Sequence, residues 1–189
     1  MQIVCMNIFP TAENGCPIQS AKEHCGKHSS RMPLETAGMI AFAFPEGETP
    51  VSNKRTHRHF IHPASVWVRK TKDNLEWSII HGLAQCEEYS RRYKRRHAAQ
   101  DMIEWADQNC RHLSFAEQGQ TEFARCFSGF KQELDATEPN TVFAYRKFYV
   151  LDKEPFAKWP SKKEIPAWWP EISDKYVDKS FVNGVYSRR

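Results

Sequence analysis

Residues 24 to 44 read HCGKHSSRMPLETAGMIAFAF, and this stretch decides the fold that the sequence predicts. Charged and polar residues fill its first half, and an apolar run without a charge follows Glu35. On a helix, His24, His28, Arg31 and Glu35 are offset by four, three and four residues, so they would share one face. Burial raises the pKa of a carboxyl group, whereas neighbouring cations lower it. The segment therefore predicts either a functional acid or an ordinary charged helix end that stays solvated.

The whole chain has the size and composition of one folded domain. It has 189 residues, of which 40% are hydrophobic and 13% aromatic, enough to bury a core. The formal net charge is only +4, so the placement of the charges matters more than their sum. No signal-peptide pattern and no apolar run of about 18 residues is present, so we expect a cytoplasmic protein without a membrane partner. Six scattered cysteines without a CxxC pair predict free thiols.

Apolar residues recur mainly with helical spacing. We predict helices, in chain order, from Ser20 to Ala43, Asp73 to Arg92, Ala98 to Cys110, Phe123 to Phe130 and Thr141 to Leu151. Gly26 and Pro33 bound the pieces if the first helix is divided in two. Residues 2 to 6 could form a short strand or an extended arm, and the Pro- and Trp-rich chain from Lys153 predicts an irregular strap. We therefore expect a mainly α, compact single domain over residues 1 to 189, a helical bundle with a C-terminal strap.

Two basic segments contain interleaved aromatic residues. The first spans residues 54 to 69 (KRTHRHFIHPASVWVR), and the second spans residues 91 to 97 (RRYKRRH). Cations neutralise phosphates, and aromatic rings stack on bases or wedge between them. Together the two segments predict contact with nucleic acid. Cations at the end of a helix also favour the helix dipole, and Trp67 could equally belong to the core.

Histidines and a cysteine occur close together in two places. His24, Cys25 and His28 form one group, and three histidines between residues 57 and 62 form the other. A structural zinc site takes four ligands, usually supplied by paired short-spaced motifs. Neither group has such a second pair, so we predict no metal ligands and no cofactor. A zinc-dependent module is the minor alternative.

Three motifs, in this order, resemble those of small helical phage and bacterial proteins. They are HCGKH at residues 24–28 continuing to Ala37, then TH at 56–57 with HP at 62–63 and WVR at 67–69, and finally EY at 88–89 with RY at 92–93 and His97. The resemblance covers roughly residues 20 to 105. This group is similar to antiphage glycosylases that excise glucosylated 5-hydroxymethylcytosine. More remotely, it resembles pyrimidine-dimer DNA glycosylases of the phage endonuclease V type.

The resemblance implies a DNA glycosylase with Glu35 as its catalytic carboxylate. Breaking an N-glycosidic bond passes through an oxocarbenium-like sugar, which a carboxylate beside the anomeric carbon stabilises. The same carboxylate can orient or deprotonate a water molecule. His28 and Arg31 would orient it or hold a phosphate, while the target base is flipped out of the stack.

The sequence departs from the family pattern in ways that bear on the chemistry. Gly26 stands where the closer relatives have Asp, and two extra residues separate His57 from the HP pair. The endonuclease V type attacks the sugar with the amine of an N-terminal threonine, whereas here Gln2 is bulky and predicts that Met1 is retained. We therefore expect hydrolysis that leaves an abasic site, without strand cleavage.

The expected substrate is double-stranded DNA that carries bulky modified pyrimidines, and we expect a monomer. Pyrimidine-dimer repair, with or without strand cleavage, is one alternative, and a non-catalytic nucleic-acid-binding module is another. The candidate catalytic residues are Glu35, His28 and Arg31. The candidate DNA-contacting residues are His24, Lys27, Arg55, His57, Arg58, His62, Trp67, Arg69, Arg92, Tyr93, Arg95 and Arg96.

Overall fold

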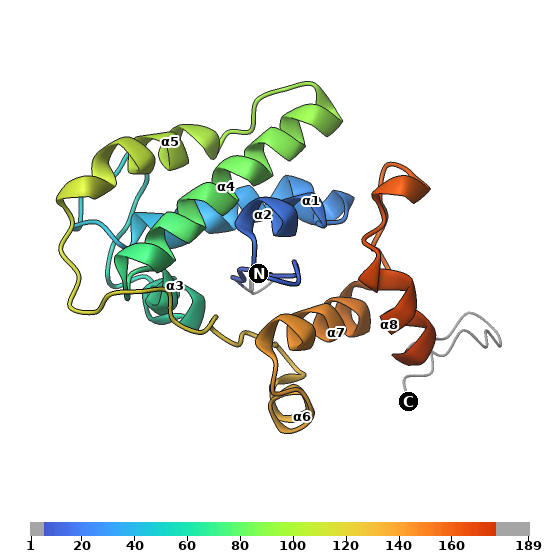
Figure 1. The fold of residues 1–189 in the computed structure, drawn as a ribbon. Coiled ribbons are helices and arrows are strands. Elements are labelled where there is room, and N and C mark those ends of the chain that lie inside the picture. Colours follow the sequence, from blue (N-terminus) through green and yellow to red (C-terminus); the bar gives the residue numbers. More distant parts are fainter. Residues whose placement is uncertain (1–5, 177–189) are drawn as a thin grey trace.

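The computed structural model describes residues 6–176, and all the helices and strands assigned in that range turn out to be helices, with no strand among them (Figure 1). The prediction of a compact, mainly α fold is therefore confirmed. The α-helices are α1 (Pro17–Lys22), α2 (Gly26–Ala41), α3 (Pro63–Val68), α4 (Lys72–Tyr93), α5 (Gln100–Asn109), α6 (Lys131–Thr137), α7 (Thr141–Lys153) and α8 (Trp168–Tyr176). Three 3₁₀ turns accompany them, η1 (Arg58–Ile61), η2 (Cys110–His112) and η3 (Lys162–Glu164).

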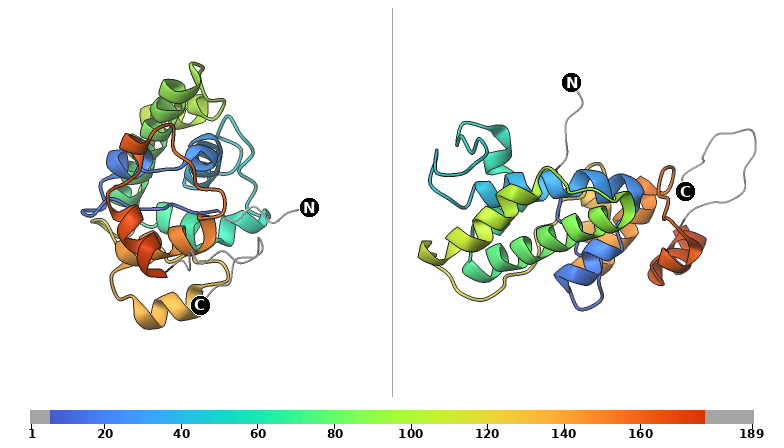
Figure 2. Two further views of the ribbon diagram at one scale, coloured as in Figure 1. Left: turned by 90° about the vertical axis from the view of Figure 1, so that its right-hand side faces the viewer. Right: turned by 90° about the horizontal axis from the view of Figure 1, so that it is seen from above.

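Helix α4 is the central element of the fold. It contacts α1, α2, α3 and α5, and its first turn is capped by Thr71, whose hydroxyl accepts a hydrogen bond from the Asn74 amide at 3.1 Å. Gly82 lets α4 approach its neighbours closely, because a Cβ there would lie 2.9 Å from the Ile103 side chain and 3.0 Å from Thr36. Helices α7 and α8 pack together on the other side of the N-terminal segment (Figures 1 and 2).

The extended segment of residues 6–12 runs between α2 and α7 and is buried along its length (Figure 1). The side-chain amide of Asn7 donates a hydrogen bond to the Cys126 carbonyl at 2.7 Å. Farther along, the Thr11 carbonyl accepts one from Arg146 on α7, also at 2.7 Å. The segment therefore joins the beginning of the described chain to its last third, and a single hydrophobic cluster extends across both sides.

Several predicted boundaries differ from the structure. The first predicted helix is two helices, and α2 begins at Gly26 and continues through Pro33. The prediction of a helix from Phe123 to Phe130 is wrong, because that stretch is irregular up to a turn at Gly129, whose φ is +79°, and α6 begins only at Lys131.

Other elements went unpredicted. Part of the supposed irregular strap is the helix α8, and neither η1 nor α3 was expected. Residues 2 to 5 of the predicted strand or arm lie outside the described residues, and Met6 has no regular structure. Within residues 6–176, no helix is long and apolar enough to cross a bilayer. The described cysteines, Cys16, Cys25, Cys86, Cys110 and Cys126, are free thiols.

Candidate active site

The Phe9 ring packs against His28 in the candidate site. Its φ of +40° is unusual for a residue with a Cβ, and it turns the ring between α2 and α7. The ring centroid lies 4.8 Å from that of His28 on α2, and 5.2 and 6.0 Å from those of Tyr149 and Phe148 on α7. These packed rings surround His28 with apolar groups.

His24 and His28 are buried and electrically neutral at neutral pH. Burial, followed by the charge of Lys153, lowers the pKa of His28 from 6.5 to about 3. Burial also holds the pKa of His24 well below its ordinary value, and His81, His28 and Arg92 lower it further. Both ring nitrogens of His24 and Nδ1 of His28 lack a hydrogen-bond partner among the described residues. The two histidines are therefore neutral, desolvated side chains that carry no charge to bind a phosphate.

Glu35 lies two turns after His28 and shares its face of α2. Burial raises the pKa of Glu35 from 4.5 to about 7, although Arg31, a hydrogen bond from the Asn7 backbone and the charge of Lys153 all lower it. Arg31 Nε lies 3.6 Å from Glu35 Oε1, and the arginine side chain is about half exposed. Oε2 has no hydrogen-bond partner among the described residues. Glu35 is therefore a buried acid with a raised pKa and one unpartnered carboxyl oxygen.

Lys153, at the end of α7, is a site residue that the sequence analysis missed. Its Nζ lies 5.8 Å from the centre of the Phe9 ring and pairs with Asp152, and its charge acts on both His28 and Glu35. On α2 itself, Lys27 is exposed, with its Nζ 4.5 Å from the centre of the Phe156 ring. No sequence pattern links Lys153 with α2, since the contact depends on how α7 packs.

A second group, the basic turn, consists of η1 and the residues that brace it. The Phe60 ring lies between two guanidinium groups, Arg69 at 3.9 Å and Arg55 at 5.4 Å from its centre. Arg69 also donates a hydrogen bond to the Phe60 carbonyl at 2.5 Å. Cation–π contacts of this kind fix the cations against a ring while leaving charge toward solvent. The structure therefore brings Arg55 and Arg69 together.

The histidines of the basic turn act as hydrogen-bond acceptors. His57 Nδ1 accepts from the His59 amide at 3.2 Å, and His62 Nδ1 accepts from the Ala64 amide at 3.2 Å, which caps α3. Burial and the charge of His59 lower the pKa of His62. Arg58 is exposed in the same turn. His57 and His62 thus shape the backbone on which the cations are carried.

Trp67 belongs to the core. Its side chain is buried, with its ring centroid 5.2 Å from Phe123 and 5.7 Å from Trp77. Its indole nitrogen donates a hydrogen bond to the Thr121 carbonyl at 3.4 Å. Only an edge of Trp67 borders a shallow pocket of about 510 Å³ beside Ile61 and Val66. Of the two predicted readings of this residue, packing accounts for its contacts.

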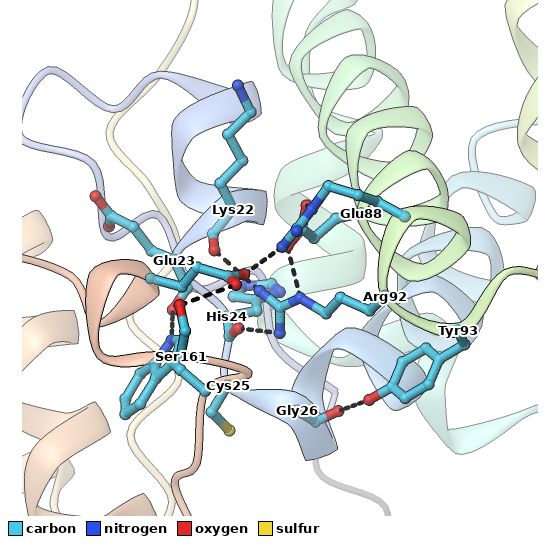
Figure 3. A network of polar contacts seen from close by, with 12 residues as sticks. Lys22, Glu23, His24, Cys25, Gly26, Glu88, Arg92, Tyr93 and Ser161 are labelled. Carbon is cyan, nitrogen blue, oxygen red and sulfur yellow. Dashed lines mark hydrogen bonds and ion pairs between the residues drawn. The ribbon is translucent and has the colours of Figure 1, made fainter.

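The second basic segment lies at the other end of α4, and its Arg92 is structural (Figure 3). The Arg92 side chain is only 2% exposed, and it donates to the His24 carbonyl at 2.8 Å, the Lys22 carbonyl at 3.2 Å and Glu88 Oε1 at 2.5 Å. These bonds fasten the junction between α1 and α2 to α4. The structure therefore gives Arg92 a bracing role in place of the predicted contact with DNA.

The other members of that segment are also engaged within the protein. The Tyr93 hydroxyl donates to the Gly26 carbonyl at 3.0 Å (Figure 3), and Arg95 Nε donates to the Tyr89 hydroxyl at 2.7 Å. Arg96 forms ion pairs with Asp101 and Glu104. Tyr93, Arg95 and Arg96 remain exposed, and of the two arginines only Arg96 has acidic partners among the described residues.

Two pockets formed by the described residues both lie away from Glu35. A cleft of about 1060 Å³ lies between α1 and residues 163–171, and Glu35 lines neither it nor the pocket beside Ile61. Within the described chain, no three His, Cys, Asp or Glu side chains are grouped so that they could hold a metal ion.

Comparisons with known proteins add no family to this picture. No family model matches the sequence, and no curated protein and no solved structure matches the chain. Any function therefore has to be argued from the site itself.

Proposed function

We propose that the protein is a DNA glycosylase that hydrolyses the N-glycosidic bond of bulky modified pyrimidines, such as glucosylated 5-hydroxymethylcytosine, and leaves an abasic site. The observation that carries the proposal is Glu35, a buried carboxyl whose pKa is raised to about 7 and whose Oε2 is unpartnered among the described residues. A carboxyl that titrates near neutral pH suits proton transfer at that pH. Its ionised form also suits an oxocarbenium-like sugar, whose positive charge it would stabilise.

Cations near Glu35 support a phosphate-bearing substrate. Arg31 is half-exposed beside the carboxylate, and the basic turn carries Arg55, Arg58 and Arg69 close to the C-terminal end of the same helix. Phe42, which caps α2, makes ring contacts with His57 and Phe60 at 6.3 and 5.7 Å. An acid flanked by exposed cations fits a sugar that is held through its neighbouring phosphates.

The direct test compares the protein with its Glu35→Gln variant, which keeps the size of the side chain and removes its charge. Each protein is incubated with DNA containing glucosylated 5-hydroxymethylcytosine and with ultraviolet-irradiated plain DNA, and hot alkali then cleaves any abasic sites. We expect cleavage of the modified DNA by the native protein and a loss of at least about a hundredfold with the variant. Glu87→Gln, at an exposed position of α4, is the matched control and should retain the activity.

The other outcomes separate the remaining function classes. Cleavage of irradiated DNA alone would favour pyrimidine-dimer repair, and cleavage before the alkali step would add a strand-cleaving activity. DNA binding with no abasic product on any modified DNA would support a non-catalytic binding module. Undiminished base release by Glu35→Gln would remove Glu35 from the mechanism.

A further inference from the structure

Ile61, at the end of η1, is an exposed apolar side chain in the basic turn, and it borders a shallow pocket with Val66 and Trp67. It is 74% exposed, the highest value among the large hydrophobic side chains of the described residues. Burying an isoleucine is strongly favourable, so this side chain would contribute free energy to any complex in which a ligand covers it. Arg55, Arg58 and Arg69 lie in or beside the same turn, and these cations favour a ligand that carries negative charge.

The backbone on both sides of Ile61 is held rigidly. Before it, Arg69 binds the Phe60 carbonyl and the Phe60 ring lies between two guanidinium groups. After it, His62 caps α3, and Pro63 follows as the first residue of that helix. Ile61 itself is β-branched, which restricts its χ1. The side chain is therefore a stiff apolar projection that loses little conformational entropy on being buried.

Contacts place this projection near Glu35. Phe42 lies seven residues after Glu35, so the two share a face of α2 at about 10 Å along the helix axis. Phe42 contacts Phe60, the residue before Ile61, and the Ser65 hydroxyl contacts Met6 Sδ at 3.9 Å. Met6 in turn lies 3.7 Å from the position of a Cβ on Gly38, one turn after Glu35. Buried Met6 thus packs between α3, which follows the basic turn, and the part of α2 that carries Glu35.

We propose that Ile61 is a wedge that enters the base stack of duplex DNA beside the target nucleotide, while the flanking arginines hold the adjacent phosphates. Apolar side chains inserted at base steps unstack and kink the duplex, and an enzyme that flips a base must fill or open the space it leaves. A protein partner that covered this isoleucine would also have to accommodate the arginines in and beside the turn, whereas duplex DNA supplies an apolar stack flanked by anions. This inference rests on the proposed glycosylase function, because it supplies the base-flipping step of that reaction.

The test measures unstacking separately from catalysis. A duplex carries one glucosylated 5-hydroxymethylcytosine next to 2-aminopurine, whose fluorescence rises when it is unstacked. In the Glu35→Gln background, which binds without base release, we expect a several-fold rise on binding. Adding Ile61→Ala should abolish most of that rise, whereas Ile61→Leu should retain it. Ile80→Ala removes an exposed isoleucine from α4, away from this pocket, and is the matched control that should behave like its parent.

Base release gives an independent measure. With Glu35 intact, Ile61→Ala should lower the single-turnover rate by about ten- to a hundredfold, because an isoleucine buried in the stack is lost. The dependence of DNA affinity on salt should be unchanged, because no phosphate contact is removed. Unstacking and base release that persist in Ile61→Ala would overturn the wedge and leave the glycosylase standing. Base release that is absent from the native protein as well would contradict the proposed function, and the fluorescence of an unmodified duplex would then still report on Ile61.

Discussion

Glu35 owes its chemical character to a competition between burial and charge. The side chain is only 8% exposed, so desolvation of the ionised form outweighs the cation of Arg31 at 3.6 Å. Arg31 is half in water, where its attraction is screened. The position of Glu35 on α2 therefore keeps its pKa at about 7, so both protonation states are populated at neutral pH.

The raised pKa of Glu35 predicts a pH-dependent stability. Between pH 4.5 and about 7 the folded protein binds more protons than the unfolded chain, so the free energy of unfolding should fall as the pH rises. The cost of ionising Glu35 should reach about 3 kcal/mol above pH 7. In Glu35→Gln this cost is absent, so the variant should gain stability relative to the native protein across that range.

Urea unfolding at a series of pH values measures this difference directly. His28, whose pKa is lowered to about 3, contributes the opposite trend, with stability lost as the pH falls below 6.5, but it is common to both proteins and cancels. Glu87→Gln should run parallel to the native protein. A difference between native protein and Glu35→Gln that does not change with pH would contradict the raised pKa.

Lys153 predicts a second effect on the same acid. Removing its charge by Lys153→Met should raise the pKa of Glu35 further. The titration of the Glu35 carboxyl, followed by carbon NMR, should move to higher pH, and the rising limb of base release with it. Lys162→Met removes an exposed cation from η3 and should leave both unchanged. An unmoved titration would show that Lys153 does not act on the site.

At this scale the sequence predicts only what lies on one helix. The predicted shared face of His24, His28, Arg31 and Glu35 is confirmed for the last three, which lie on α2, but His24 precedes that helix. Phe9 and Lys153 could not be found in this way, because an extended segment and a helix more than a hundred residues apart meet only in the folded chain. The bracing role of Arg92 could not be predicted for the same reason, because its carbonyl partners lie on α1 and just before α2, far from it in the sequence.

Among the elements, those with a continuous apolar stripe were the predictable ones. Helices α4, α5 and α7 begin and end within two residues of the predicted bounds. The helix α8 follows a Pro- and Trp-rich stretch, whose composition favours irregular chain, and tertiary packing on α7 overrides that preference. The turn η1 and helix α3 are short and are fixed by side-chain caps, which leave no periodic signal.

The close contact at Gly82 predicts a stability effect at the level of helix packing. Gly82→Val should destabilise the fold by about 1–3 kcal/mol, because its side chain would overlap Thr36 of α2 and Ile103 of α5. Urea unfolding measures the change. Glu87→Val introduces the same residue at an exposed position of α4 and should cost only about 0.5 kcal/mol. Equal losses in the two variants would show that helix propensity, and not packing, sets the cost.

Across the whole molecule, the two basic segments stand at opposite ends of α4 (Figure 1). The 22 residues of that helix span about 33 Å, so the two segments have different surroundings and different roles. One braces the α1–α2 junction with buried hydrogen bonds, while the other leaves its cations facing solvent around Phe60. The net charge of +4 alone does not reveal that the two basic segments have different roles.

This division predicts unequal effects of two arginine substitutions in one segment. Arg92→Gln should destabilise the protein by about 3 kcal/mol, because it removes a buried cation from Glu88 and from two backbone carbonyls. Arg95→Gln, three residues away and exposed, should change stability by no more than about 0.5 kcal/mol. Thermal unfolding of both variants, monitored by circular dichroism, decides the matter. A stable Arg92→Gln protein would mean that the junction does not need the brace.

The buried segment of residues 6–12 also determines at what stage of protein synthesis the site can form. Its partners Cys126 and Arg146 are synthesised more than a hundred residues later, so the segment has no place to settle while α7 is still inside the ribosome. Phe9, and with it the wall against His28, waits for the same event. Contacts between such distant parts of a chain form slowly. A newborn chain would thus lack the contacts of Phe9 and Lys153 beside His28 and Glu35 until its last third has been made.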